Sequence, residues 1–121
     1  MEKEPTSEGY SRGATLIAPK VLITTARLTA LGVPGVVGLA PIPGGVNRLF
    51  RRGDGEGVRI EVDGQAVSVD LHLIVGQGTN VRELGRKVQA EVARAIEELI
   101  GMSVQRIDIH IEDVDYTAPL P

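Results

Sequence analysis

The side chains of this sequence that could take part in chemistry gather on segments with strand-like alternation. Ser68, Asp70 and His72 occupy alternate positions of one such segment. His110 lies in a second segment near the C-terminus. Alternate residues of a strand point to the same side of a sheet, so two neighbouring strands would bring both histidines and several carboxylates onto one face. Zinc accepts imidazole and carboxylate ligands, and Ser68, His72 and Asp70 have the residue types of a nucleophilic relay.

The geometry of a strand argues against both activities. Successive positions on one side of a strand are roughly 7 Å apart, so a hydrogen-bonded relay cannot close within one strand. A flat sheet face also supplies no pocket for a substrate. We therefore expect no enzyme, no catalytic residue, no metal ligand and no cofactor, and we interpret the alternating charges as a surface that contacts a protein partner. The residues expected on this surface are Arg59, Asp70, His72, Arg106 and His110.

A glycine-rich stretch before the first clear strand carries three arginines, Arg48, Arg51 and Arg52. Such a basic loop is a candidate for contact with a protein partner, with RNA or with acidic lipid. The net charge of −3 and the pI near 5.4 argue against a general polyanion binder, because nucleic-acid-binding domains usually carry a basic excess. Two tyrosines and one phenylalanine leave little surface for base stacking. A solvated surface loop is the simpler interpretation, and if the loop has a role, a protein partner and a phosphate group fit it equally well. For the protein as a whole, protein partners are expected and a nucleic acid is not.

The residues Gly78, Thr79 and Asn80 lead from a predicted strand into a predicted helix. Backbone N–H groups at a helix N-terminus can hold an anion, so these three positions are candidates for anion binding. The segment matches neither a Walker A loop nor a dinucleotide-binding fingerprint, and a simple turn also accounts for the glycine.

Hydrophobic periodicity predicts two helices. Pro19, which the first helical turn tolerates, begins a helix that runs to about Gly32. Asn80 begins a longer helix that Gly101 ends, and Asn80 with Glu83 has the spacing of a helix cap. The apolar stripe of this second helix consists of Val81, Leu84, Val88, Val92, Ile96 and Leu99.

Alternation and turn residues predict the strands. A short strand is expected around Ala14–Ile17, another around Gly35–Leu39, and a last one in which Ile107, Ile109 and Ile111 alternate with polar residues.

The clearest strand signal is a hairpin around the dipeptide Asp63-Gly64, which is typical of tight turns. A type I′ turn at this dipeptide would pair Ile60 with Val67 and Val58 with Val69, and would place the apolar residues of both strands on one side.

Together these elements predict an α+β two-layer sandwich. One mainly antiparallel sheet is covered on one face by two helices, and its other face is open and polar. The 121 residues are room for one domain, which we expect at 14–113 between a disordered tail at 1–13 and a C-terminal tail at 114–121. The chain lacks the roughly 20 apolar residues that cross a bilayer, and its N-terminus lacks the apolar core of a secretory signal, so no direct membrane insertion is expected.

The sequence resembles the alkaline shock protein family, the envelope stress response proteins of Gram-positive bacteria. The resemblance covers about residues 14 to 113 and depends on the order and spacing of several short segments. These are Ile17-Ala18-Pro19-Lys20-Val21, Val33-Pro34-Gly35-Val36-Val37-Gly38-Leu39, Gly57-Val58-Arg59-Ile60-Glu61-Val62, Val67-Ser68-Val69-Asp70-Leu71, Asn80-Val81, Val88-Gln89 and residues 101–111.

The resemblance implies a non-enzymatic scaffold or adaptor linked to cell-envelope homeostasis or stress response. It also implies homo-oligomers and a cytoplasmic protein, held peripherally at the inner face of the membrane by a small membrane-anchoring protein. The alternative hypothesis is an RNA-associated α+β module that uses the loop from Arg48 to Arg52. A third hypothesis, an enzyme, would use His72 or His110.

Overall fold

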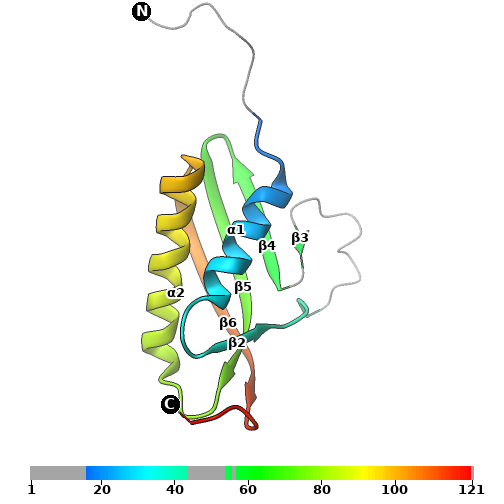
Figure 1. Ribbon diagram of the computed structural model, residues 1–121. Coiled ribbons are helices and arrows are strands. Elements are labelled where there is room, and N and C mark those ends of the chain that lie inside the picture. The colour runs from blue at the N-terminus through cyan, green and yellow to red at the C-terminus, as the bar shows by residue number, and fades with distance from the viewer. Residues whose placement is uncertain (1–15, 44–53, 56, 121) are drawn as a thin grey trace, which may run out of the picture.

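The protein folds into two layers, with helices on one side of a sheet (Figure 1). This computed structural model describes residues 16–43, 54–55 and 57–120. The helices α1 (Pro19–Leu31) and α2 (Val81–Ala95) both lie over the same face of the sheet, and a π-helical turn, η2 (Ile96–Ile100), continues α2. In the described part of the chain no helix covers the opposite face. The expected α+β sandwich is confirmed.

The sheet is built around its longest central strand. Its members are β2 (Val36–Leu39), β3 (Asp54–Gly55), β4 (Val58–Asp63), β5 (Ala66–Gly76) and β6 (Ser103–Asp115). One edge of β5 pairs antiparallel with β4 and, further along, with β2, while β3 extends the sheet beyond β4. The other edge of β5 pairs with β6, and this pair is parallel because α2 carries the chain back to the starting end. The sheet is therefore mainly antiparallel with one parallel pair.

The hairpin of β4 and β5 forms, but the predicted register is wrong by two residues. Ile60 lies opposite Val69, and the turn residues are Gly64 and Gln65. Gly64 has a φ of 63°, whereas no residue other than glycine has a positive φ in the described chain. A type I′ turn needs positive φ at both central residues, which Asp63 would have to adopt. A two-residue turn whose first central residue is Gly64 avoids that strain, because glycine adopts a positive φ without penalty. Because side chains alternate along a strand, shifting the pairing register by two residues leaves every side chain on its predicted face.

The core lies between the sheet and the two helices. The inward side of β5 is closed completely, since each of its five apolar residues is at most 1% exposed. These residues are Val67, Val69, Leu71, Leu73 and Val75. The middle of the predicted α2 stripe, from Leu84 to Ile96, is buried against them.

The two ends of that stripe are not buried. Val81 is exposed, and Leu99 is 78% exposed, contrary to the prediction for the stripe. The cause at the C-terminal end is the π turn, in which the Gly101 N–H donates to the Ile96 carbonyl five residues earlier at 3.0 Å. This wider turn brings Ile100 to the core in place of Leu99. Gly101, at a φ of 84°, ends the helix as predicted.

The strand predicted at Ala14–Ile17 is absent from the part of this segment that the structure describes. Leu16 and Ile17 lie in no strand, and residues 14 and 15 are outside the described residues. The chain instead enters α1 directly, with Ala18 as an extended cap and Pro19 in the first turn. Proline suits that position because its missing N–H would have no helical partner there.

β2 and β4 meet end to end along the same edge of β5, and Gly57 makes the junction possible. Its φ is 74°, and a Cβ atom there would lie 2.7 Å from the Leu39 Cβ and 2.8 Å from the Ala40 carbonyl oxygen. The Gly57 carbonyl accepts from the His72 N–H, and the Ala40 N–H donates to the His72 carbonyl. The backbone of His72 is therefore held from both of these strand ends.

Candidate functional site

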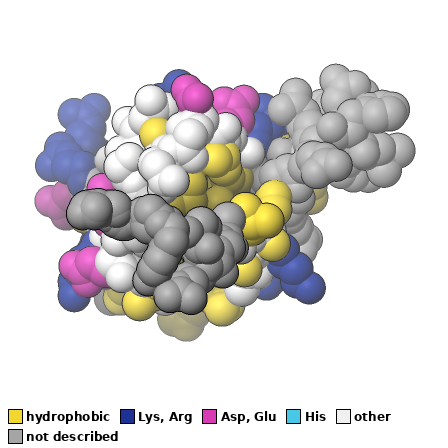
Figure 2. Space-filling model, turned by 90° about the horizontal axis from the view of Figure 1, so that it is seen from above, with side chains coloured by type: hydrophobic (Ala, Val, Ile, Leu, Met, Phe, Trp, Pro, Cys, Tyr) yellow, Lys and Arg dark blue, Asp and Glu magenta, His cyan; other side chains and the backbone are white. Residues whose placement is uncertain are grey.

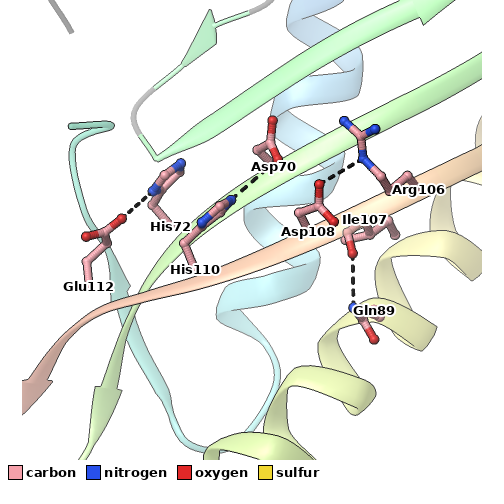
Figure 3. A network of polar contacts seen from close by, with 8 residues as sticks. All are labelled: Asp70, His72, Gln89, Arg106, Ile107, Asp108, His110 and Glu112. Carbon is pink, nitrogen blue, oxygen red and sulfur yellow. Dashed lines mark hydrogen bonds and ion pairs between the residues drawn. The ribbon is translucent and has the colours of Figure 1, made fainter. Parts of the chain in front are cut away.

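The sheet face away from the helices, which we call the open face, carries both histidines. It presents outward-pointing residues of β4, β5 and β6, namely Arg59, Glu61, Ser68, Asp70, His72, Arg106, Asp108, His110 and Glu112. His72 and His110 are direct partners in the parallel register of β5 and β6. Their rings stack with centroids 4.3 Å apart and an angle of 7° between the planes (Figure 3). The structure thus brings the two predicted histidines together.

Each histidine contacts a carboxylate on the neighbouring strand. Nδ1 of His72 lies 2.6 Å from Oε2 of Glu112, and Nε2 of His110 lies 3.5 Å from Oδ1 of Asp70 (Figure 3). His72 is buried, at 7% exposure, and Glu112 is the polar group that satisfies it within this part of the sheet. A buried polar group costs free energy unless it is hydrogen-bonded, so the Glu112 contact stabilises this arrangement.

An irregularity in the β5–β6 ladder explains how Glu112 reaches His72. The register pairs Leu73 with Ile111 but Ile74 with Asp113, which leaves Glu112 as an extra residue without a direct partner. Such a bulge bends the strand and redirects side chains. Sequence reasoning placed Glu112 on the polar side of the last strand but did not identify it as the partner of His72, because the bulge depends on pairing between distant segments.

The remaining charges of the open face form a second group beside the histidines. Nε of Arg106 lies 2.8 Å from Oδ2 of Asp108. Asp108 is also the register partner of Asp70, and Arg59 is the register partner of Asp70 on its other side. Like charges directly opposite one another destabilise a sheet, and the neighbouring cations offset that repulsion. The five residues predicted for a protein-contact surface therefore lie on one face, across three adjacent strands.

The geometry is poorly suited to a nucleophilic relay and to a zinc site. Ser68 donates from Oγ to Oε1 of Gln105 at 3.3 Å, so its hydroxyl points toward β6 and not toward an imidazole. The lone pairs of stacked, nearly parallel imidazole rings lie in separate planes, which prevents both rings from ligating one ion. Across residues 16–43, 54–55 and 57–120, no group of three or more His, Asp or Glu side chains is placed to hold a metal.

The predicted anion-binding residues lie at the start of α2. Gly78, Thr79 and Asn80 line a groove of about 310 Å³, together with Pro34, Gly35, Glu83, Leu84 and Lys87. Oδ1 of Asn80 accepts from the backbone N–H of Glu83 at 3.1 Å, so the helix cap uses one of the amides that an anion would need. The Glu83 carboxylate adds negative charge at this groove. Anion binding stays a prediction.

Arg48, Arg51 and Arg52 lie outside the described residues, and their predicted role stays a prediction. The RNA-associated hypothesis depended on this loop. Neither helix of the described chain combines the length and the apolar character that crossing a membrane requires.

Comparison with protein families gives a match over most of the chain. Residues 7–116 match the model of the alkaline shock protein 23 family, described as having a cell envelope-related function. The uncharacterized protein YloU of Bacillus subtilis is 28% identical over 107 residues, which covers 85% of this chain and 89% of YloU. The uncharacterized protein YqhY of the same organism is 24% identical over 106 residues, covering 86% of this chain and 78% of YqhY.

Solved structures share the fold at lower sequence identity. The MamM CTD in its copper form superposes with a TM-score of 0.57 at 17% identity, covering 83% of this chain and 90% of that domain. A zinc form of a MamM CTD variant superposes with the same TM-score of 0.57 at 18% identity, covering 82% of this chain and 89% of that domain. At this identity the likeness concerns the fold alone.

Proposed function

Because the chain belongs to the alkaline shock protein 23 family, whose function is cell envelope-related, we propose that the protein is a non-enzymatic scaffold or adaptor of the cell envelope. It works through protein contacts and self-association, and the open face is its contact surface. The observation that carries this proposal is the polar network across β5 and β6, centred on the stacked histidines. The resemblance of the sequence to envelope stress response proteins supports the same role.

The open face is organised before any partner arrives. His72, Glu112, Arg106 and Asp108 are each held by a neighbour on the same sheet, so their side chains lose little conformational freedom on docking. Arg106 and Asp108 carry opposite charges and Glu112 adds a further carboxylate, which gives a surface that selects a complementary partner by charge. A rigid polar surface of this kind suits recognition of a protein.

Self-association has a ready template next to the open face. In the described chain β6 pairs only with β5, so the other edge of this 13-residue strand faces outward. One backbone group on β6 is already covered, because Nε2 of Gln89 on α2 donates to the Ile107 carbonyl at 3.0 Å (Figure 3). An edge strand can pair with a second chain, and such pairing would join two open faces into one larger surface.

The oligomeric state of charge variants tests this function. Arg106→Glu combined with His110→Glu changes two exposed side chains of the open face, and we expect it to abolish self-association. Arg94→Glu is the matched control, because Arg94 forms an exposed i,i+4 pair with Glu98 on α2, away from the sheet. Light scattering across a concentration series measures the assembly, and far-UV circular dichroism checks that each variant folds. Equal association of both variants, or no association of the unchanged protein, would contradict the proposal.

The proposed location is cytoplasmic, at the inner face of the membrane and attached through a small membrane-anchoring protein. Fractionation of source cells after in-cell crosslinking tests it. Recovery with the membrane through a crosslinked protein supports the proposal. Recovery in the soluble fraction, bound to RNA or to nothing, argues against the tether.

A further inference from the structure

Helix α1 has apolar side chains on two opposite sides. Its inner side is buried against the sheet and α2. On the outer side Val21, Leu28 and Leu31 are 46%, 58% and 38% exposed. Thr24 completes a series spaced by three and four residues, which keeps all four in one line along the helix. We call Val21, Thr24, Leu28 and Leu31 the outer stripe of α1.

The outer stripe has the spacing of a coiled-coil seam. Val21 and Leu28 take heptad position a, and the other two residues take position d. In this register Lys20 and Arg27 both fall at position g, along one flank of the stripe. The helix contains no Asp or Glu, so this flank is purely cationic. Figure 2 views the protein from the end at which α1 begins, where hydrophobic side chains reach the surface beside Lys and Arg.

We propose that the outer stripe of α1 binds an amphipathic helix of a partner protein, one whose apolar seam is flanked by Glu or Asp. The apolar residues of that helix would cover Val21, Leu28 and Leu31, which removes their surface from water. Its acidic residues would pair with Lys20 and Arg27, which fixes its orientation. The proposal rests on the proposed function in taking protein binding as the role, and it adds a second surface and the chemistry of its partner.

A second copy of α1 does not fit this surface. In an antiparallel pair position g faces position g, so Lys20 and Arg27 would meet like charges from the other copy. In a parallel pair position g faces position e, where α1 has Thr25 and Gly32, and neither residue offers a negative charge. Charge complementarity therefore selects a different, acidic helix.

A membrane surface also fits poorly. Segments that bind anionic lipid by charge carry clusters of about 4–8 Lys or Arg, whereas α1 has two. Helices that lie in the bilayer interface commonly use Trp or Phe on the apolar side, and α1 has no aromatic residue. The exposed side chains of the outer stripe are aliphatic and match the seam of a helix pair.

Two synthetic helices test the proposal with the full-length protein. Each peptide spans about three heptads with Leu at a and d, and carries Glu at e and g in one peptide and Lys in the other. Like charges on both flanks keep each peptide from pairing with itself. In a fluorescence anisotropy titration we expect the Glu peptide to bind at least about tenfold more tightly than the Lys peptide, with the difference shrinking as salt is added.

Variants of the exposed stripe give the decisive comparison. Leu28→Glu should remove binding of the Glu peptide, and Lys20→Glu with Arg27→Glu should reverse the preference between the peptides. Arg94→Glu on α2 is the control and should bind as the unchanged protein does. Equal binding of both peptides, no binding of either, or full binding by the Leu28→Glu protein would overturn the proposal.

Further measurements distinguish an acidic helix from the other possible occupants of the outer stripe, and separate this proposal from the proposed role of the open face. Loss of self-association in Leu28→Glu would show a second copy on the stripe, and stripe-dependent binding to vesicles of anionic lipid would show a membrane; either result would overturn the proposal. The open-face variant Arg106→Glu with His110→Glu should keep peptide binding. A failure of the open-face test and a failure of the α1 test are therefore separate results.

Discussion

The two sides of strand β5 differ in what their residues contact. On the inward side five consecutive alternate positions are aliphatic and closed from solvent, and they pack against both helices. On the outward side Asp70 and His72 contact side chains of β6 through hydrogen bonds and ring stacking. Adjacent residues of one strand therefore serve the core and the candidate contact surface. Substitution at neighbouring positions should separate stability from binding.

The largest expected effect comes from the inward side. Leu73→Ala should lower the free energy of unfolding by about 2–5 kcal/mol, because it removes a buried side chain and leaves a cavity. Urea denaturation measures the change. Ile74→Ala, at the next position and half-buried on the outward side, is the control and should lose clearly less. Equal losses at the two positions would break the contrast between the sides of β5.

The second effect concerns the junction that holds β5 from one edge. Gly57→Ala should destabilise the fold by about 2 kcal/mol or more, because the new Cβ would meet the Leu39 Cβ and the Ala40 carbonyl and the left-handed backbone would be strained. Gly64→Ala is the matched control. Its φ is also positive, at 63°, but nothing lies within 4 Å of its added Cβ, so only the backbone strain applies. Thermal unfolding of both variants compares them, and a larger loss at Gly64 would refute the close-approach argument.

The third effect separates the two histidines of the open face. His72→Ala should cost about 1–3 kcal/mol, since it leaves the half-buried Glu112 carboxylate without its partner. His110→Ala should cost less than about 1 kcal/mol, because His110 is exposed and its contact with Asp70 is long. Chemical denaturation of both proteins gives the comparison. A larger loss of stability in His110→Ala than in His72→Ala would contradict the argument that the buried His72–Glu112 contact is the more stabilising of the two.

The smallest effect lies at the C-terminal end of β6, where Asp115 is the register partner of Gly76. Hydrogen bonds from the Thr117 hydroxyl and backbone N–H hold the pKa of Asp115 below its ordinary value of 3.8. A lowered folded pKa gives a stabilising contribution that is present above the ordinary value and is lost as the pH falls through the folded one. Thr117→Val keeps the N–H and removes the hydroxyl, so the pKa of Asp115 should rise toward 3.8. A carboxyl titration by NMR measures it, and an unchanged pKa would show that the hydroxyl has no part.

Local patterns predicted the elements of this fold well. Alternation identified β4, β5 and β6, and the three-to-four periodicity with Asn80 and Gly101 defined the long helix. The hairpin register was missed because the position of positive φ depends on which turn type the chain adopts, and Asp63-Gly64 is compatible with more than one. The π turn that exposes Leu99 leaves no signature in the hydrophobic pattern.

The sequence predicted which residues lie on the open face but not how their side chains contact one another. Strand alternation put Asp70, His72 and His110 on one side of a sheet, and the structure agrees. The ring stacking and the contact with Glu112 depend on the parallel register of β5 and β6 and on its bulge. Both are set by tertiary packing through α2, which no local pattern reports.

The π turn at the end of α2 has a consequence for chain length. A π turn holds one residue more than the α-helical turn that it replaces. In η2 the residue that is left over is Leu99, and its side chain is exposed to solvent. Deleting Leu99 would therefore close η2 into an α-helical turn without moving Ile96 or the start of β6. Relatives that differ from this chain by one residue in length at this place should keep the same sheet and the same open face.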